Sequence, residues 1–194
     1  MSSPSDARYR VRERIRDVDG RRVDRAEDRL TGRSVVLKTL PRDEAVHEAT
    51  LLARLPAGLG ATLIEIFGTG EERTLALEDL PGQTLSALAG SLAPASRLEI
   101  LGDLARQLGR LHRVGIVHAD VAPGNVLVDP ETSAVRLLDF GFSISELPGA
   151  GSARPPEAGG SFGYVAPEIL RGWTPERRSD QYAFGVLARS WLGT

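Results

Sequence analysis

The first forty residues alternate between apolar and polar positions, which is the pattern of β-strands. In the stretch RYRVRERIR, Tyr9, Val11 and Ile15 fall on one side and the arginines on the other. Successive side chains point to opposite faces of a strand, so this stretch is predicted to be a half-buried strand. An Asp-Gly turn signal follows it, and a second turn precedes the β-branched stretch SVVLKTL. These signals predict a β-meander with strands over residues 8–16, 21–28 and 34–40.

Helical spacing first appears over residues 42–55. The apolar stripe of this helix is expected to consist of Val46, Ala49, Leu52 and Leu55. Two more strands are predicted at 61–68 and 73–80, on either side of a Gly-Thr-Gly turn. A connector rich in Gly, Ala, Pro and Ser, with one short helix, is expected at 81–96.

A long amphipathic helix is predicted to begin at Ser96. The sequence SRLE matches a capping box, in which Ser96 and Glu99 satisfy free backbone N–H groups at the start of the helix. Its apolar stripe is expected to consist of Leu98, Leu101, Leu104, Leu108 and Leu111.

The predicted elements change from mostly β to mostly α near residues 80–83. This order predicts an α+β fold with two lobes. Residues 1–7 are expected to be a disordered N-terminus, residues 8–80 a small β-rich lobe with one helix, and residues 81–194 a mostly helical lobe.

Composition and charge narrow the function classes. The formal net charge of the 194 residues is −2, which argues against a nucleic-acid partner. The ten arginines between residues 8 and 33 are interleaved with acidic residues, which indicates a solvated sheet face. Cysteine is absent, so disulfides and thiolate metal sites are excluded. No apolar run approaches the roughly 20 residues of a membrane span, and no signal-peptide core is present. We expect a cytoplasmic protein with no membrane span in this chain.

Four residues form a pattern suited to phosphate chemistry. Asp120 and Asn125 lie in one predicted loop, and Asp139 ends an apolar stretch fourteen residues further on. Together they offer one carboxylate to accept a proton and two oxygen ligands for Mg²⁺, which binds few protein oxygens together with phosphate oxygens. Lys38 is the one lysine among 24 cationic residues, so this position favours a compact ammonium over a planar guanidinium. The set predicts phosphoryl transfer from a nucleotide.

Motifs in the same order make the chain resemble a protein kinase of the serine/threonine type, similar to the bacterial ones. They are VVLK, HEATLLARL, HADVAPGN, DFG, GSFGYVAPE and SDQYAFGV. The resemblance implies ATP and Mg²⁺ as cofactors, with Lys38 on the α- and β-phosphates and Glu48 as its partner. It implies Asp120 as the catalytic base and Asn125 and Asp139 as metal ligands. The adenine contacts that it implies are Val36, Leu77, Glu78, Leu80 and Leu127.

The resemblance also implies supporting roles. Asp180 is expected to hold the catalytic loop, and His118 to be a packing residue. Ser161 aligns with the threonine of the family's substrate platform and is expected to contact Asp120 rather than accept phosphate. The activation segment, Asp139 to Glu168, also contains Ser143, Ser145 and Ser152.

Several positions depart from the family pattern. Only Gly20 remains of the three glycines that let backbone N–H groups approach the phosphates, and Arg16, Arg21 or Arg22 are candidates to replace them with side-chain charge. Ala119 replaces an arginine that receives an activation-loop phosphate. Ala122 replaces the lysine that steadies the transferred phosphate in serine/threonine kinases.

The chain ends inside or just after the helix that Asp180 begins. We expect a C-terminally truncated, incomplete C-lobe, from a truncated gene or an excerpt of a longer protein with further domains. In such a lobe Glu168 lacks its usual ion pair, and apolar surface around Trp173 and Trp191 is expected to be exposed.

Three functions remain open at this point. The first is a kinase that phosphorylates serine or threonine in a protein substrate. The second is a pseudokinase or kinase fragment that acts as a nucleotide- or protein-binding module, which the altered glycine loop favours. The third is a small-molecule phosphotransferase of the aminoglycoside kinase type, which the PGN in the catalytic loop suits but the GSFGYVAPE segment does not.

Overall fold

The structure is a computed structural model that describes residues 8–88, 92–129, 131–147 and 159–193. The expected disordered N-terminus (1–7) and Ser152 lie outside the described residues. The chain divides into two compact units, Met1–Ala53 with Ala61–Leu80, and Arg54–Gly60 with Pro81–Thr194. We describe each unit by itself.

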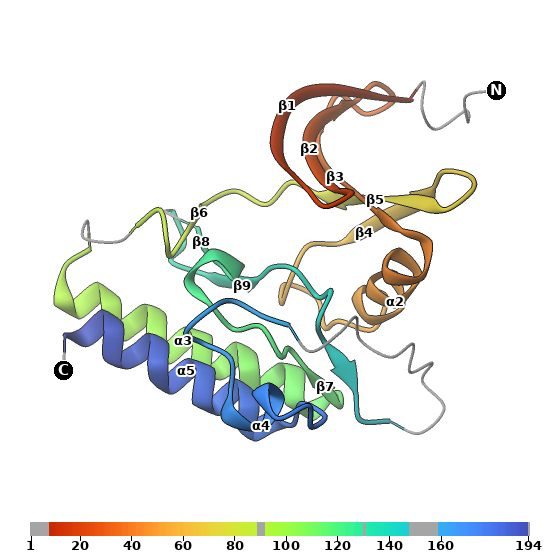
Figure 1. Cartoon of the computed structure of the whole chain (residues 1–194). Coiled ribbons are helices and arrows are strands. Elements are labelled where there is room, and N and C mark those ends of the chain that lie inside the picture. Colours follow the sequence, from red (N-terminus) through yellow and green to blue (C-terminus); the bar gives the residue numbers. More distant parts are fainter. Residues whose placement is uncertain (1–7, 89–91, 130, 148–158, 194) are drawn as a thin grey trace. The chain divides into compact units, whose positions relative to one another are not determined.

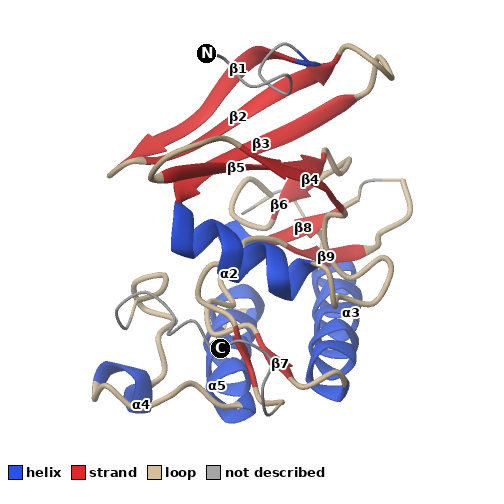
Figure 2. Cartoon of the chain, turned by 90° about the vertical axis from the view of Figure 1, so that its right-hand side faces the viewer, coloured by secondary structure: helices blue, strands red, loops and turns tan. Residues whose placement is uncertain are grey.

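In its described residues, the first unit is a five-stranded antiparallel sheet with the helix α2 (Arg42–Leu52) (Figures 1 and 2). The strand order in the sheet is β1-β2-β3-β5-β4. The helix α2 packs on β3, β4 and β5. The strands are β1 (Tyr9–Val18), β2 (Arg21–Asp28), β3 (Ser34–Pro41), β4 (Leu63–Phe67) and β5 (Glu72–Glu78).

The sequence signals for the meander are confirmed, but the burial of its first strand is not. The turn between β1 and β2 holds two residues, Asp19 and Gly20, both with positive φ, as a type I′ hairpin requires. Val11 and Ile15, however, are 51% and 49% exposed, and only Tyr9 of β1 is buried. β1 is an edge strand, and its pairing shifts register twice, so its apolar residues do not share one covered face.

The helix α2 forms as predicted but buries a different face. It ends at Leu52 instead of continuing to Leu55, and Val46 is 48% exposed. Its buried residues are Ala45, His47, Glu48, Leu51 and Leu52. A buried Glu at the centre of this face means that a polar contact, and not apolar periodicity alone, sets the orientation of the helix.

The second unit is built around two helices that pack on each other, α3 (Pro94–Arg113) and α5 (Arg177–Leu192) (Figure 1). A three-stranded sheet has the order β6-β8-β9, and a two-stranded sheet pairs β10 with β7. The remaining elements are β6 (Gln83–Thr84), β7 (Ile116–Val117), the 3-10 helix η1 (Pro123–Asn125), β8 (Val126–Val128), β9 (Val135–Leu137), β10 (Ile144–Ser145) and α4 (Pro167–Leu170).

Two predictions about α3 were wrong in detail. The helix begins at Pro94, which suits a first helical turn, so Ser96 lies inside that turn and makes no capping hydrogen bond. The capping box of this unit is instead at α5, between Glu176 and Ser179. Leu98 is 59% exposed, whereas the other four leucines of the predicted stripe are buried. The described part of the connector before α3 contains β6 and a turn in place of the expected short helix.

The two tryptophans of the second unit differ in burial. Trp173 is 63% exposed, as expected, but Trp191 is only 8% exposed, because it lies on the buried side of α5. Among the described helices, none is both long and apolar enough to cross a membrane.

Candidate active site

The lysine and glutamate singled out in the sequence form a close ion pair within the first unit. Lys38 Nζ lies 2.9 Å from Glu48 Oε1 and 2.7 Å from Oε2. Lys38 is fixed near the end of β3, where it pairs with Val23 of β2 and Leu75 of β5. The Glu48 side chain is only 2% exposed, so its negative charge is buried beside the Lys38 ammonium.

The β1–β2 turn occupies the place of the missing glycine-rich loop. Arg21, the first residue after the turn, donates two hydrogen bonds to Glu44 of α2, from Nε to Oε2 at 2.9 Å and from Nη2 to Oε1 at 2.6 Å. Arg22 lies 3.3 Å from Asp24. Two of the three arginines proposed as phosphate contacts, Arg21 and Arg22, therefore face carboxylates of their own unit, and the third, Arg16, is exposed on β1. The bidentate pair of Arg21 with Glu44 was not predicted, because no spacing rule links residues that lie so far apart in the sequence.

Four of the predicted adenine contacts belong to the strands β3 and β5 or follow them. Val36 and Leu77 are direct cross-strand partners. Glu78 accepts hydrogen bonds from the backbone N–H and the hydroxyl of Thr62, and Leu80 is half-buried. Leu127 belongs to the second unit, where it is 8% exposed at the centre of β8.

The second unit places Asp120 and Asn125 in direct contact. Asn125, the last residue of η1, donates from Nδ2 to Asp120 Oδ2 at 2.6 Å and to the Asp120 carbonyl at 2.9 Å. This orientation leaves the amide oxygen of Asn125 available as a ligand. Asp120 Oδ1 accepts a second hydrogen bond, 2.6 Å from the backbone N–H of Ser161. The contact between Ser161 and Asp120 is thus confirmed, although the main chain makes it.

Asp139 lies at the same end of the β8–β9 hairpin as Asn125. Asn125 precedes β8, Asp139 follows β9, and the Leu138 N–H donates to the Asn125 carbonyl at 2.9 Å. Asp139 has a φ of 59°, a left-handed conformation that is uncommon for a residue with a side chain. Its neighbour Phe140 is buried against His118, with ring centroids 5.0 Å apart, which confirms His118 as a packing residue.

The donor set at this end of the hairpin fits a magnesium ion. One carboxylate and one amide oxygen are hard ligands, and Mg²⁺ completes its octahedron with water and phosphate oxygens. Among the described residues, no group of three or more His, Cys, Asp or Glu side chains is arranged to hold a metal ion. The two oxygens therefore suit a metal that arrives with a nucleotide better than one held by protein ligands alone.

Asp180 holds the catalytic loop from α5, as expected. Its carboxylate is fully buried and accepts the backbone N–H groups of His118 at 2.9 Å and Ala119 at 2.8 Å. Ala119 has a φ of 64°, so these bonds hold a backbone conformation that alanine rarely adopts. His112 Nε2 lies 2.7 Å from the same carboxylate, a contact that sequence reasoning missed because His112 stands outside every motif.

The activation segment is fixed at both described ends. The hydroxyl of Ser143 donates to the His118 carbonyl at 2.9 Å, and this serine is fully buried. At the other end, Ser179 donates to Glu168 Oε1 at 2.7 Å, and this hydrogen bond lowers the pKa of Glu168. Glu168 therefore has a neutral partner in place of a cation.

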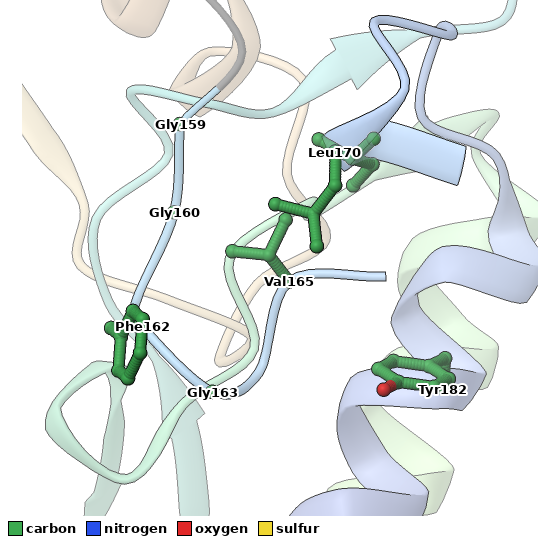
Figure 3. Close-up of a pocket in the computed structure, with 8 residues that line it drawn as sticks. Gly159, Gly160, Phe162, Gly163, Val165, Leu170 and Tyr182 are labelled. Atoms are coloured by element: carbon green, nitrogen blue, oxygen red, sulfur yellow. The ribbon is translucent and has the colours of Figure 1, made fainter. Parts of the chain in front are cut away.

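An apolar pocket of about 450 Å³ lies beside Ser161 (Figure 3). It is formed by the end of the activation segment together with α4 and α5. Its side chains include Phe162, which is fully exposed, and Tyr182, which is 43% exposed. The lining residues are Gly159, Gly160, Phe162, Gly163, Val165, Ile169, Leu170 and Tyr182.

Comparison with known proteins agrees with the fold. Residues 20–192 match the family model described as protein kinase domain. The chain is 33% identical to serine/threonine-protein kinase mos of Patiria pectinifera over 178 residues, which is 81% of this chain and 50% of that protein. It is 31% identical to serine/threonine-protein kinase PknB of Mycolicibacterium smegmatis over 180 residues, 84% of this chain and 28% of that protein. It is also 36% identical to probable serine/threonine-protein kinase fnkB of Dictyostelium discoideum over 120 residues, 60% of this chain and 23% of that protein.

The chain therefore belongs to the protein kinase family. Its fold is the α+β fold of that family, with a β-rich N-terminal lobe that carries one helix and a mostly helical second lobe. The chain spans half or less of the length of the curated relatives named above.

Proposed function

We propose that this chain transfers the γ-phosphoryl group of ATP to a serine or threonine hydroxyl of a protein substrate. The single observation that carries the proposal is the constellation at the end of the β8–β9 hairpin. There the Asp120 carboxylate is oriented by Asn125, and Asp139 lies at the neighbouring strand end. A proton acceptor and two hard metal ligands in one loop cluster are what phosphoryl transfer needs from a protein.

The proposed chemistry assigns one role to each residue. The substrate hydroxyl oxygen bonds to the γ-phosphorus while the bond from that phosphorus to the β–γ bridging oxygen breaks, and the hydroxyl proton passes to Asp120. ADP leaves with the bridging oxygen. Mg²⁺, held by Asn125 and Asp139, would neutralise charge on the phosphates. Lys38, kept in place by Glu48, binds the α- and β-phosphate oxygens as a point charge.

The apolar pocket beside Ser161 supports a peptide substrate. Gly160 lines this pocket, and the next residue donates to the proposed base. A substrate hydroxyl at Asp120 would thus bring a neighbouring apolar side chain of the peptide within reach of the pocket. An apolar pocket at this position favours a protein substrate over an aminoglycoside, because an aminoglycoside is polar and has no apolar side chain to place there.

A pseudokinase is the second candidate, and the β1–β2 turn favours it. Arg21 is bound to Glu44 by two hydrogen bonds and does not replace the lost glycine amides in this arrangement. Such a protein would bind a nucleotide or a partner protein without transferring a phosphoryl group.

We also predict that the protein is cytoplasmic and that the chain belongs to a longer protein with further domains.

Nucleotide binding separates these functions. Titration calorimetry with Mg·ATP should show that Asp139→Ala loses binding, because it removes the metal-ligating carboxylate. Asp120→Asn should bind within about threefold of wild type while its ADP production falls at least about a hundredfold, the scale of general-base loss. Binding in wild type with no ADP production would favour the pseudokinase, and transfer to an aminoglycoside but not to protein would contradict the protein-kinase proposal.

A further inference from the structure

Each oxygen of the Asp120 carboxylate accepts one short hydrogen bond. Oδ2 receives the side-chain amide of Asn125 and Oδ1 receives the backbone N–H of Ser161, both at 2.6 Å. Asp120 is 8% exposed. Hydrogen bonds to a charged acceptor away from water are among the stronger ones in proteins. The two donors together therefore fix the rotation of the carboxylate about its side-chain bonds.

The donor from the activation segment is the main chain of Ser161. Within the described residues, the Ser161 hydroxyl makes no hydrogen bond, whereas its N–H donates to Asp120 Oδ1. Ala122, two residues beyond Asp120, is 2% exposed and has no side-chain donor to offer. A carboxylate has about four acceptor positions, so two bonded donors leave positions for a substrate hydroxyl.

Gly160 allows the segment to approach so closely. Its φ is +150°, and a Cβ at this position would lie 3.1 Å from Val165 Cγ2 and 3.4 Å from Asp120 Oδ1. The next turn is closed by a hydrogen bond of 3.0 Å from the Tyr164 N–H to the Ser161 carbonyl. A side chain at 160 would be strained at this φ and would crowd Val165, so we expect a larger residue to disturb the approach of the Ser161 N–H to the carboxylate.

We propose that the main-chain N–H of Ser161 is a positioning group that holds Asp120 in the orientation to accept the substrate proton. The inference rests on the proposed phosphoryl transfer and adds a second positioning donor beside Asn125. It differs from what the resemblance implies, because the N–H and not the hydroxyl acts. The activation segment reaches the base through a bond that any residue at position 161 other than proline preserves.

Removing only this N–H is the direct test. In the full chain, the Gly160–Ser161 amide is replaced by an ester, with serine exchanged for its α-hydroxy acid. We expect kcat to fall at least about tenfold, the effect of losing one charge-assisted hydrogen bond at a reacting group, while the KM for Mg·ATP changes less than about threefold. Ser161→Ala keeps the N–H, so its loss of kcat should be several times smaller.

Glycine substitutions provide a second, genetically simple test. Gly160→Ala should lower kcat more than Gly172→Ala, because Gly172 also has a positive φ, +79°, but has open space around a Cβ and does not line the pocket. If Ser161→Ala loses as much activity as the ester, the hydroxyl makes the functional contact and the proposal is wrong. An ester variant with wild-type kcat would also overturn it.

A readout without turnover keeps the proposal distinct from the proposed function. Hydrogen exchange of the Ser161 amide, followed by NMR, should be slow in wild type and at least about tenfold faster in Asp120→Ala, since the acceptor is removed. Equal exchange in both proteins would show that the contact does not form, even in an active kinase. A protected amide in a chain without ATP turnover would instead overturn the proposed function and reduce the contact to a structural one.

Discussion

Replacing Asp180 by alanine should destabilise the second unit strongly. The Asp180 carboxylate is fully buried and accepts two backbone N–H groups, from His118 and Ala119, and also contacts His112. Alanine removes every acceptor atom and leaves the donors in place. The left-handed backbone of Ala119 loses one of the bonds that hold it.

The expected magnitude follows from the number of buried donors. A buried N–H that loses its partner costs about 1–3 kcal/mol, so two of them cost about 2–6 kcal/mol of unfolding free energy. A domain is typically stable by only about 5–15 kcal/mol. Asp180→Asn keeps one oxygen and should lose roughly half as much, which makes it the variant to measure if the alanine variant does not fold.

Urea unfolding followed by tryptophan fluorescence is the assay, because Trp173 and Trp191 both belong to the second unit. Asp129→Ala is the matched control. Asp129 also accepts two backbone N–H groups, from Glu131 and Thr132, but in a partly exposed turn where water can replace it. Its loss should stay below about 1 kcal/mol. An Asp180→Ala loss no larger than that of the control would refute the reasoning.

Three further predictions concern single positions. Lys38→Arg should lower kcat at least about tenfold in an ADP-release assay, since a planar guanidinium does not reproduce the compact ammonium beside Glu48; normal turnover would remove any special role from the one lysine. The hydrogen bond from Arg8 holds the pKa of Asp28 well below its usual range, so its contribution to stability is present above about pH 4 and is lost as pH falls further. Urea midpoints between pH 6 and pH 2 should therefore fall less in Asp28→Asn than in wild type, and equal slopes would contradict this. Gly109→Ala, inside α3 with open space around the new Cβ, should raise the unfolding free energy by about 0.5–1 kcal/mol, and a decrease would show a contact that the structure lacks.

Local patterns predicted the meander and the helices well, because turn chemistry and periodicity act over a few residues. The Asp-Gly turn, the position of Lys38 on the third strand and the helix after it all follow from such signals. Apolar periodicity failed where tertiary contacts decide. The buried face of α2 is set by the pairing of Glu48 with Lys38, and β1 is an edge strand whose bulges expose Val11 and Ile15.

In the candidate site, too, the sequence predicted which residues take part but did not predict the contacts that depend on tertiary packing. The motifs named Asp120, Asn125 and Asp139, and the β8–β9 hairpin brings the last two to one end. The sequence could not show that the main chain of Ser161 contacts the base, because every residue type except proline carries a backbone N–H. Nor could it show that Arg21 binds Glu44, since the two are brought together only by the packing of the sheet on α2.

The most direct test of the account is Mg·ATP turnover by the purified chain, with ADP release and the intact mass of a protein substrate measured in parallel for wild type and Asp120→Asn. The account predicts ADP and one added phosphate in wild type, both lost in the variant while its urea midpoint stays unchanged. Undiminished transfer in Asp120→Asn, or no transfer from a folded wild-type chain that binds Mg·ATP, would contradict it.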